Sequence, residues 1–354
     1  MIPSIHPWNQ QLWQQLTLEP ERSHHALLFA GGPGLGKRVF AEALAAYVLI
    51  DGNLRHEGLF KAGSHPDFYV IHPEDLVANP TDNDSSAFAL SNQYALRLIP
   101  KHSGKPKKDI SIDQIRMLAP LLSTHSHIAK NRVVLVDNAD SMNTSASNAL
   151  LKSLEEPPAN TLFILVSDRA DSLTPTIKSR CSKVLFHAPD AQTTAAWLKA
   201  NAKMSDEDIA SYAPMANNHP LLAVKLQQQG YREVTKTLLQ SVNNLWTNTA
   251  HVSQSAQQWK TIGGTMAIDM LHKLCADLIR LQESEDSSSL FYPVQQSWTT
   301  KVANKLDQQR LHLLFDEFAN LKRLISTNVD EVLVLESLGN QFRLLPQNAA
   351  QALI

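Results

Sequence analysis

The sequence predicts an α/β domain with a parallel sheet, followed by helices alone. In the first half of the chain, short and unbroken apolar runs alternate with segments in which apolar residues recur every three or four positions. Beyond about Pro189 the unbroken runs stop, and the helical spacing continues to the end. Strands that are apolar on both faces and alternate with helices are typical of a parallel sheet that helices cover on both sides.

Five apolar runs are the expected strands of this sheet. They are residues 27–30, 68–71, 132–136, 162–166 and 184–186. The first run leads directly into a glycine-rich turn, residues 31–36, and the apolar spacing after the turn predicts a helix that reaches Ile50. Another helix is expected over residues 141–156, because Asn143 or Thr144 can cap its start and two prolines follow its end.

The second half is expected to be entirely helical. Residues 190–229 predict two or three short helices, which Pro214 and the stretch 217–220 interrupt. Apolar stripes predict longer helices around residues 268–278 and 311–324. The expected domains are an α/β core at residues 1–187, a small helical domain at 188–232 and an all-helical domain at 233–354.

The composition excludes several classes of protein. Of the 354 residues, 43% are hydrophobic and 19% are charged, as in a globular protein that buries a core. Lysine and arginine (32) nearly balance aspartate and glutamate (34), so DNA binding through an overall basic surface is not expected. The two cysteines, Cys181 and Cys275, exclude a disulfide scaffold and a four-cysteine zinc site. With no bilayer-length apolar stretch and no targeting pattern at the N-terminus, a cytoplasmic location is expected.

Residues 31–38 nearly match the phosphate-binding pattern G-x-x-x-x-G-K-[ST]. In that pattern the glycines let backbone N–H groups converge on phosphate, the lysine neutralises phosphate charge, and the final hydroxyl ligates Mg²⁺. The candidate nucleotide-binding residues that fit the pattern are Gly31, Gly34, Gly36 and Lys37. Arg38 stands where the hydroxyl is required, and it brings a second positive charge to the expected position of the cation.

Asp137 completes this candidate nucleotide site. It ends an apolar run, where an aspartate that holds Mg²⁺ is expected. The next residue is Asn138, where many ATPases of this type have a glutamate that orients the attacking water. The two departures predict weak nucleotide binding and poor or absent hydrolysis. The alternative is that the loop is only a tight turn, with Lys37 paired to Asp137.

A set of segments in the first half is more specific than the phosphate loop. These segments are residues 7–8, 24–28, 31–38, 65–69, 112–116, 148–158 and 179–181. Together they resemble the δ′ subunits of the bacterial DNA polymerase III clamp loader. The most specific parts are Leu-Glu-Glu-Pro-Pro at 154–158 and Ser-Arg-Cys at 179–181. The resemblance covers the first half and continues weakly through Asn328 and residues 333–338.

The resemblance implies an AAA+ module, with an α/β core, a helical lid and a C-terminal collar that joins the subunits of a hetero-pentamer. The implied partners are the ATPase subunits γ and τ, the clamp-opening δ subunit and, indirectly, the sliding clamp and primed DNA; no membrane is involved. The chain would have no activity alone. It would be a component of a DNA-directed DNA polymerase (nucleotidyltransferase) holoenzyme and of its clamp-loading ATPase.

Arg180 is the catalytic residue that the resemblance implies. The δ′ subunits usually do not hydrolyse ATP, and they supply an arginine to the nucleotide of a neighbouring subunit. Arg180 matches this trans arginine finger, whose guanidinium offsets charge on the transferring phosphoryl group. The alternative is a surface arginine held in a salt bridge.

No cofactor is required under this resemblance, although residual ATP binding stays open. Many members carry a four-cysteine zinc module, but residues 51–63 contain no cysteine, so no zinc and no other metal is expected. The second-sensor arginine is missing at 217–222, and Ser167 is either a residual first sensor or plain turn chemistry. The lysine-rich loop 101–108 either contacts a DNA backbone or is simply solvated.

Two other functions compete with this one. An active AAA+ motor subunit of the γ/τ type needs a serine or threonine at position 38 and usually a glutamate at 138, and neither is present. A DNA-binding regulator built on an inactive AAA+ core needs a basic C-terminal helix. After residue 314 the only basic residues are Lys322, Arg323 and Arg343.

Overall fold

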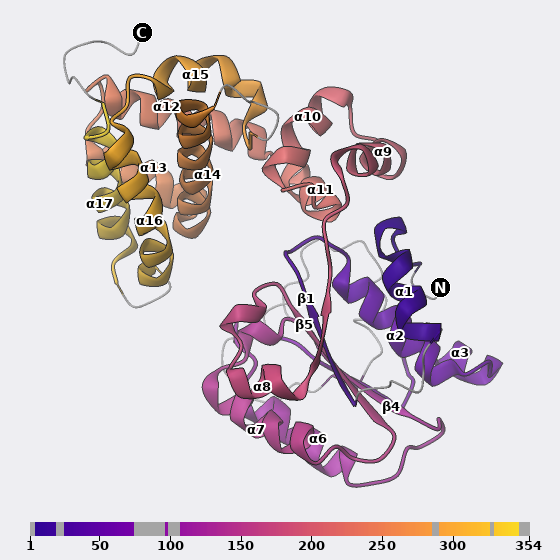
Figure 1. Ribbon diagram of the computed structural model, residues 1–354. Helices are drawn as coiled ribbons and strands as arrows, with labels where there is room; N and C mark the ends of the chain where they lie inside the picture. The colour runs from indigo at the N-terminus through magenta and orange to yellow at the C-terminus, as the bar shows by residue number, and fades with distance from the viewer. Residues whose placement is uncertain are drawn as a thin grey trace. The chain divides into compact units, whose positions relative to one another are not determined.

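The computed structural model describes residues 4–18, 25–73, 107–284, 290–325 and 329–346, and the backbone of 96–97. The chain divides into two units, Met1–Pro189 and Asp190–Ile354 (Figure 1). The division lies two residues after the end expected for the α/β core, at 187. The expected boundary at 232 lies inside the second unit, close to the start of the helix Tyr231–Trp246.

The first unit contains the predicted parallel sheet. Its strands are β1 (Ala26–Ala30), β2 (Phe68–Ile71), β3 (Leu96–Arg97), β4 (Arg132–Val136), β5 (Thr161–Ser167) and β6 (Ser182–Leu185). They pair in parallel in the order β3-β2-β4-β5-β1-β6. All of the predicted strands are present, and the predicted α/β fold with a parallel sheet is confirmed. The two-residue strand β3 was not predicted, because no apolar run marks it.

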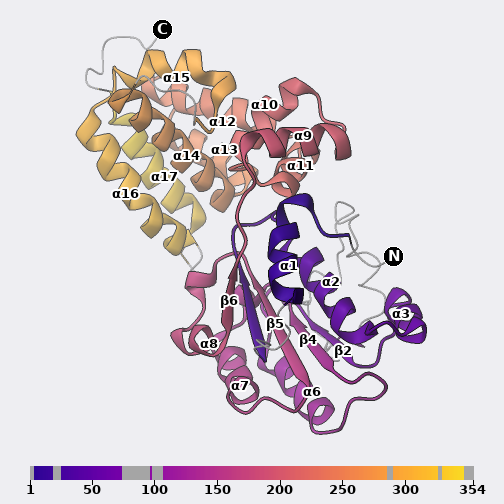
Figure 2. The ribbon, with the colours of Figure 1, turned by 45° about the vertical axis from the view of Figure 1, so that its right-hand side comes forward.

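Helices cover both faces of this sheet (Figure 2). They are α1 (Gln10–Leu18), α2 (Lys37–Ile50), α3 (Leu54–Lys61), α6 (Ile112–Leu122), α7 (Thr144–Glu155) and α8 (Pro175–Arg180). Successive strand residues point to opposite faces, so Phe29 packs with the α2 side and Leu28 with the α7 side. The helix expected from residue 141 begins at Thr144, because Asn143 caps it by accepting the Ala146 N–H at 2.9 Å.

In its described residues the second unit is entirely helical, as predicted. Its helices are α9 (Ala191–Asn201), α10 (Asp206–Met215), α11 (Pro220–Gln228), α12 (Tyr231–Trp246), α13 (Val252–Ile262), α14 (Gly264–Glu283), α15 (Gln296–Ala303), α16 (Gln308–Ile325) and α17 (Glu331–Arg343). The two predicted apolar stripes lie on α14 and α16, which face each other in one buried cluster. None of the helices that the structure describes is long and apolar enough to cross a membrane.

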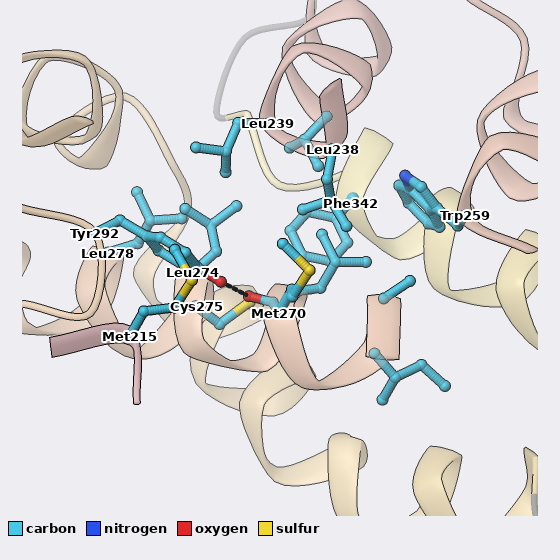
Figure 3. Close-up of a cluster of buried hydrophobic side chains, with 14 of the residues drawn as sticks. Met215, Leu238, Leu239, Trp259, Met270, Leu274, Cys275, Leu278, Tyr292 and Phe342 are labelled. Atoms are coloured by element: carbon cyan, nitrogen blue, oxygen red, sulfur yellow. Dashed lines mark hydrogen bonds between the residues drawn. The ribbon is translucent and has the colours of Figure 1, made fainter. Parts of the chain in front are cut away.

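The buried cluster of the second unit is closed by paired polar groups (Figure 3). Tyr292 is fully buried, and its hydroxyl donates to the Met270 carbonyl at 3.0 Å. The buried Asp277 carboxylate accepts the backbone N–H groups of Phe291 and Tyr292, both at 2.9 Å. A buried polar group costs little only when it is hydrogen-bonded, so these pairs fix the packing of α14 against the segment that follows it.

One buried histidine, His65, and two half-buried ones, His6 and His272, predict that stability depends on pH. Burial lowers the pKa of His6, His65 and His272 from the ordinary value of 6.5. Their neutral forms are favoured in the folded state, so this stabilisation is present above about pH 6.5 and is lost as the pH falls through the lowered values. We expect urea titrations to show a falling free energy of unfolding below about pH 6.5, by about 1.4 kcal/mol per unit of lowered pKa. His65→Gln should weaken the dependence of the free energy of unfolding on pH, whereas the same change at the exposed His251 should not. If the two variants show the same pH dependence, it arises from groups other than His65.

Candidate functional site at the two edges of the sheet

The phosphate loop lies at the carboxyl edge of the sheet, between β1 and α2. Gly34 and Gly36 have φ angles of 78° and 81°, in the left-handed region that favours glycine. A Cβ atom at Gly31 would lie 2.6 Å from the Phe186 carbonyl oxygen, so a side chain there would collide with the backbone. The glycines of the pattern are therefore required by the fold itself, whether or not phosphate binds.

Lys37 is buried at this edge, and its ammonium group is hydrogen-bonded within the chain. Its side chain is only 3% exposed, and its Nζ donates to the carbonyls of Gly31 at 2.7 Å and Gly32 at 2.6 Å. The third partner is the Asp168 carboxylate, at 2.6 Å. An ammonium group has three N–H donors, so every donor of Lys37 has a partner within the chain.

Asp168 was not among the residues predicted from the sequence. The alternative interpretation of the loop paired Lys37 with Asp137, and this pairing is wrong, because Lys37 pairs with Asp168. Asp168 directly follows β5, and β5 lies beside β1 in the sheet. Its place after an apolar run was the available signal, but only the strand order puts this run next to the loop.

Arg38 is the partner of Asp137. Its NH1 lies 2.8 Å from Asp137 Oδ2, and its Nε lies 3.2 Å from Glu42 Oε1. The guanidinium thus occupies the place beside Asp137 where a cation was expected. Asn138, the next residue, has a φ angle of 61°, a left-handed conformation that asparagine tolerates better than glutamate.

The N-terminal segment packs directly on the phosphate loop. The indole of Trp8 donates to the Leu35 carbonyl at 3.0 Å, and the side chain of Asn9 donates to the same oxygen at 2.9 Å. The ring of His6 stacks on Trp8 and lies so close to Gly36 that a Cβ there would be 2.5 Å from it. The N-terminal segment therefore packs against the phosphate loop and stabilises it. No local sequence pattern predicted this contact.

The two sensor positions serve local structure. Ser167 Oγ accepts the Arg169 N–H at 3.1 Å, which is ordinary turn chemistry. Asn217 and Asn218, at the expected second-sensor segment, have φ angles of 54° and 58° in the turn between α10 and α11. Pro220 then starts α11.

Arg180 lies at the opposite, amino edge of the sheet. It is the last residue of α8, and β6 starts at Ser182, which is in register with Leu27 near the start of β1. The phosphate loop follows the other end of β1. Five strand residues at about 3.3 Å each separate the two edges by about 15 Å. Arg180 and the phosphate loop of its own chain therefore lie at opposite edges of the sheet.

Three of the segments that carried the resemblance, residues 24–28, 148–158 and 179–181, meet around Arg180. An open depression of about 600 Å³ is lined by His25, by Leu154 and Glu155 at the end of α7, and by residues 179–182. His25 Nε2 lies 3.0 Å from the Leu154 carbonyl, which joins the start of β1 to the end of α7. Burial raises the pKa of the neighbouring Cys181 thiol to about 11, so this thiol stays protonated and is not a nucleophile.

The His-Pro-Asp segment at 65–67 is a structural support. The Asp67 carboxylate is fully buried and accepts the backbone N–H groups of His127, Ile128 and Ala129. Within the described part of the chain, no group of three or more His, Cys, Asp or Glu side chains is placed to hold a metal ion. Of the lysine-rich loop, Lys107 and Lys108 are exposed, and residues 101–106 lie outside the described residues.

The family model and the relatives found by sequence agree on one family. The family model described as "DNA polymerase III, delta subunit" matches residues 8–190. A protein of Pseudomonas aeruginosa named DNA polymerase III subunit delta' is 29% identical over 356 residues, which cover 98% of this chain and 99% of that protein. Its namesake in Escherichia coli is 28% identical over 67% of this chain and 65% of its own. A solved structure of a gamma subunit-related protein of Thermotoga maritima is 17% identical, covers 94% of this chain and 98% of its own, and has a TM-score of 0.48.

Proposed function

The chain belongs to the DNA polymerase III delta subunit family, and on that premise we propose that it is a δ′-like subunit of the bacterial replicative clamp loader, within the DNA polymerase III holoenzyme. In this proposal it stabilises the loader ring and supplies Arg180 to the ATP site of a neighbouring ATPase subunit while a sliding clamp is loaded on primed DNA. Its partners are the γ or τ ATPase subunits and the clamp-opening δ subunit in a cytoplasmic hetero-pentamer, joined through the helical second unit.

The position of Arg180 is the observation that carries this proposal. Its guanidinium lies at the amino edge of the sheet, about 15 Å of strand away from the phosphate loop of the same chain. A fixed arginine offsets charge on a phosphoryl group only where it touches that group. Arg180 can therefore act on a nucleotide only if another subunit holds it.

The chain itself does not hydrolyse ATP in this proposal. The donors of Lys37 are all used within the chain, and the Arg38 guanidinium stands beside Asp137 in place of a cation. The residue after Asp137 is Asn138, so this position has no carboxylate that could orient a water molecule. The same contacts disfavour an active motor subunit of the γ/τ type.

The nucleotide affinity of the chain alone follows from these contacts. We expect the wild-type chain to bind Mg-ATP only in the millimolar range or more weakly, about −4 kcal/mol, and not to hydrolyse it. The double variant Arg38→Thr, Asp168→Asn releases Asp137 and one donor of Lys37, and it should bind at least about 10-fold more tightly in a calorimetric titration.

Arg169→Thr is the matched control for this titration. It removes a positive charge from the same edge of the sheet, where Arg169 is exposed and lies 3.7 Å from Asp140, and it leaves the loop untouched. This variant should bind like the wild type. Micromolar binding of Mg-ATP by the wild-type chain would show that the internal contacts of Lys37 and Arg38 do not prevent nucleotide binding.

Clamp loading tests the assigned role as a whole. The chain, the ATPase subunit and the δ subunit are mixed with sliding clamp, primed DNA and ATP, with and without this chain. We expect a stable complex that contains the chain, and loading of clamp on DNA only when the chain is present. Equal loading without the chain, or failure of the wild-type chain to enter the complex, would overturn the clamp-loader role.

A further inference from the structure

The Leu-Glu-Glu-Pro-Pro segment contains two adjacent glutamates, Glu155 and Glu156, and only Glu155 forms an ion pair with Arg180. Glu155 Oε1 lies 2.6 Å from the NH2 of Arg180. Glu156 is exposed, and its side chain makes no hydrogen bond or ion pair with the described residues. Both residues are glutamates and they are adjacent in the chain, so the sequence alone does not show which of them pairs with Arg180.

Some N–H donors of the Arg180 guanidinium have partners within the chain, and others do not. Its NH1 donates to the Thr176 carbonyl at 3.0 Å, within α8, and lies 3.4 Å from Ser179 Oγ. Glu155 holds its NH2. A guanidinium has five N–H donors, and among the described residues Nε–H and one hydrogen of NH2 have no hydrogen-bond or ion-pair partner. These two donors remain for phosphate oxygens while Glu155 stays in place.

The backbone position of Glu155, the other member of this pair, is well fixed. Glu155 is the last residue of α7, whose end is fixed by Pro157, Pro158 and the burial of Leu154. The side chain of Arg180 is 32% exposed and would sample many rotamers without a partner. Ordering such a side chain at the moment of phosphate contact costs conformational entropy, and a pre-ordered guanidinium avoids most of that cost.

We infer that Glu155 is the positioning residue of the arginine finger: its carboxylate holds the Arg180 guanidinium in the orientation in which the two remaining N–H donors meet the nucleotide of the neighbouring subunit. The inference rests on the proposed trans role of Arg180. Glu155 itself does not touch the nucleotide, and it acts only through Arg180.

Single-turnover ATP hydrolysis by the reconstituted loader tests this role. The phase that Arg180→Ala slows reports the site that the finger completes. In that phase we expect Glu155→Ala to slow hydrolysis about 5-fold and Glu155→Gln, which keeps an acceptor oxygen, about 2-fold. Glu156→Gln removes the same charge one residue away and should have no effect. Urea unfolding of each free chain shows whether the variants keep the wild-type fold.

A double variant separates positioning from a structural effect. In an Arg180→Ala background, Glu155→Ala should cause no further slowing, because the residue acts only through the missing guanidinium. Additive slowing, an effect equal to that of Glu156→Gln, or faster hydrolysis in Glu155→Gln would overturn the inference. If Arg180→Ala itself changes no phase, the proposed trans role fails instead, so the two failures are distinguishable.

Discussion

Arg180→Ala is expected to slow ATP hydrolysis at one site of the assembled loader by about 10³-fold or more, while the loader still assembles. The expected size follows from the charge that develops on the transferring phosphoryl group, which a fixed guanidinium offsets in a site that excludes water. Arg180 contacts no buried core residue through its charged group, so its loss leaves the folded chain intact. DNA- and clamp-stimulated ATPase activity and clamp loading should therefore fall together.

Two further variants sharpen this measurement. Arg180→Lys keeps the charge but not the planar set of donors, and it should restore only part of the activity. Lys178→Ala removes a positive charge from the same helix, where the lysine reaches only the Asp171 carbonyl at 3.5 Å, and it should behave like the wild type. An unchanged rate in Arg180→Ala, with intact assembly, would leave the chain a scaffold role alone.

Asp67→Ala is expected to lower the free energy of unfolding by about 3–5 kcal/mol. The carboxylate is fully buried and accepts three backbone N–H groups, from His127 at 2.6 Å and from Ile128 and Ala129 at 2.9 Å each. Alanine would leave all three donors without their acceptor in the interior, beside the start of β4. Asp67 is thus the reason that a His-Pro-Asp segment supports the sheet although it lies far from both candidate sites along the chain.

Urea denaturation measures this effect directly. Asp67→Asn keeps one acceptor oxygen and should cost less than Asp67→Ala. Asp113→Ala removes an aspartate that is 59% exposed on its side chain, and the loss should be about 0.5 kcal/mol or less. A loss below about 1 kcal/mol in Asp67→Ala would mean that water or a rearranged loop satisfies the three N–H groups.

The fold was largely predictable because its signals are local. Each strand that is buried on both faces needs an unbroken apolar run, and all five such runs became strands. The helices α1 and α3 gave no comparable signal, because neither contains a fully buried residue. The strand β3 consists of two residues and leaves no pattern that could be read.

The candidate nucleotide site was predictable only in part. The sequence alone determined that residue 38 is an arginine and residue 138 an asparagine, and the chemistry of these groups was enough to predict a defective site. It did not determine which acid pairs with which base. Lys37 pairs with Asp168 across 131 positions, and Arg38 pairs with Asp137 across 99 positions.

The region around Arg180 divides in the same way. The sequence determined that the chain carries Ser-Arg-Cys and Leu-Glu-Glu-Pro-Pro, which were sufficient to indicate the family and Arg180. Only the tertiary structure decided that Glu155, and not Glu156, holds Arg180, and that the pair lies at the amino edge of the sheet. The physical reason is that a local pattern fixes which backbone conformation a segment adopts, whereas the partner of a charged side chain depends on the order and register in which distant strands pair.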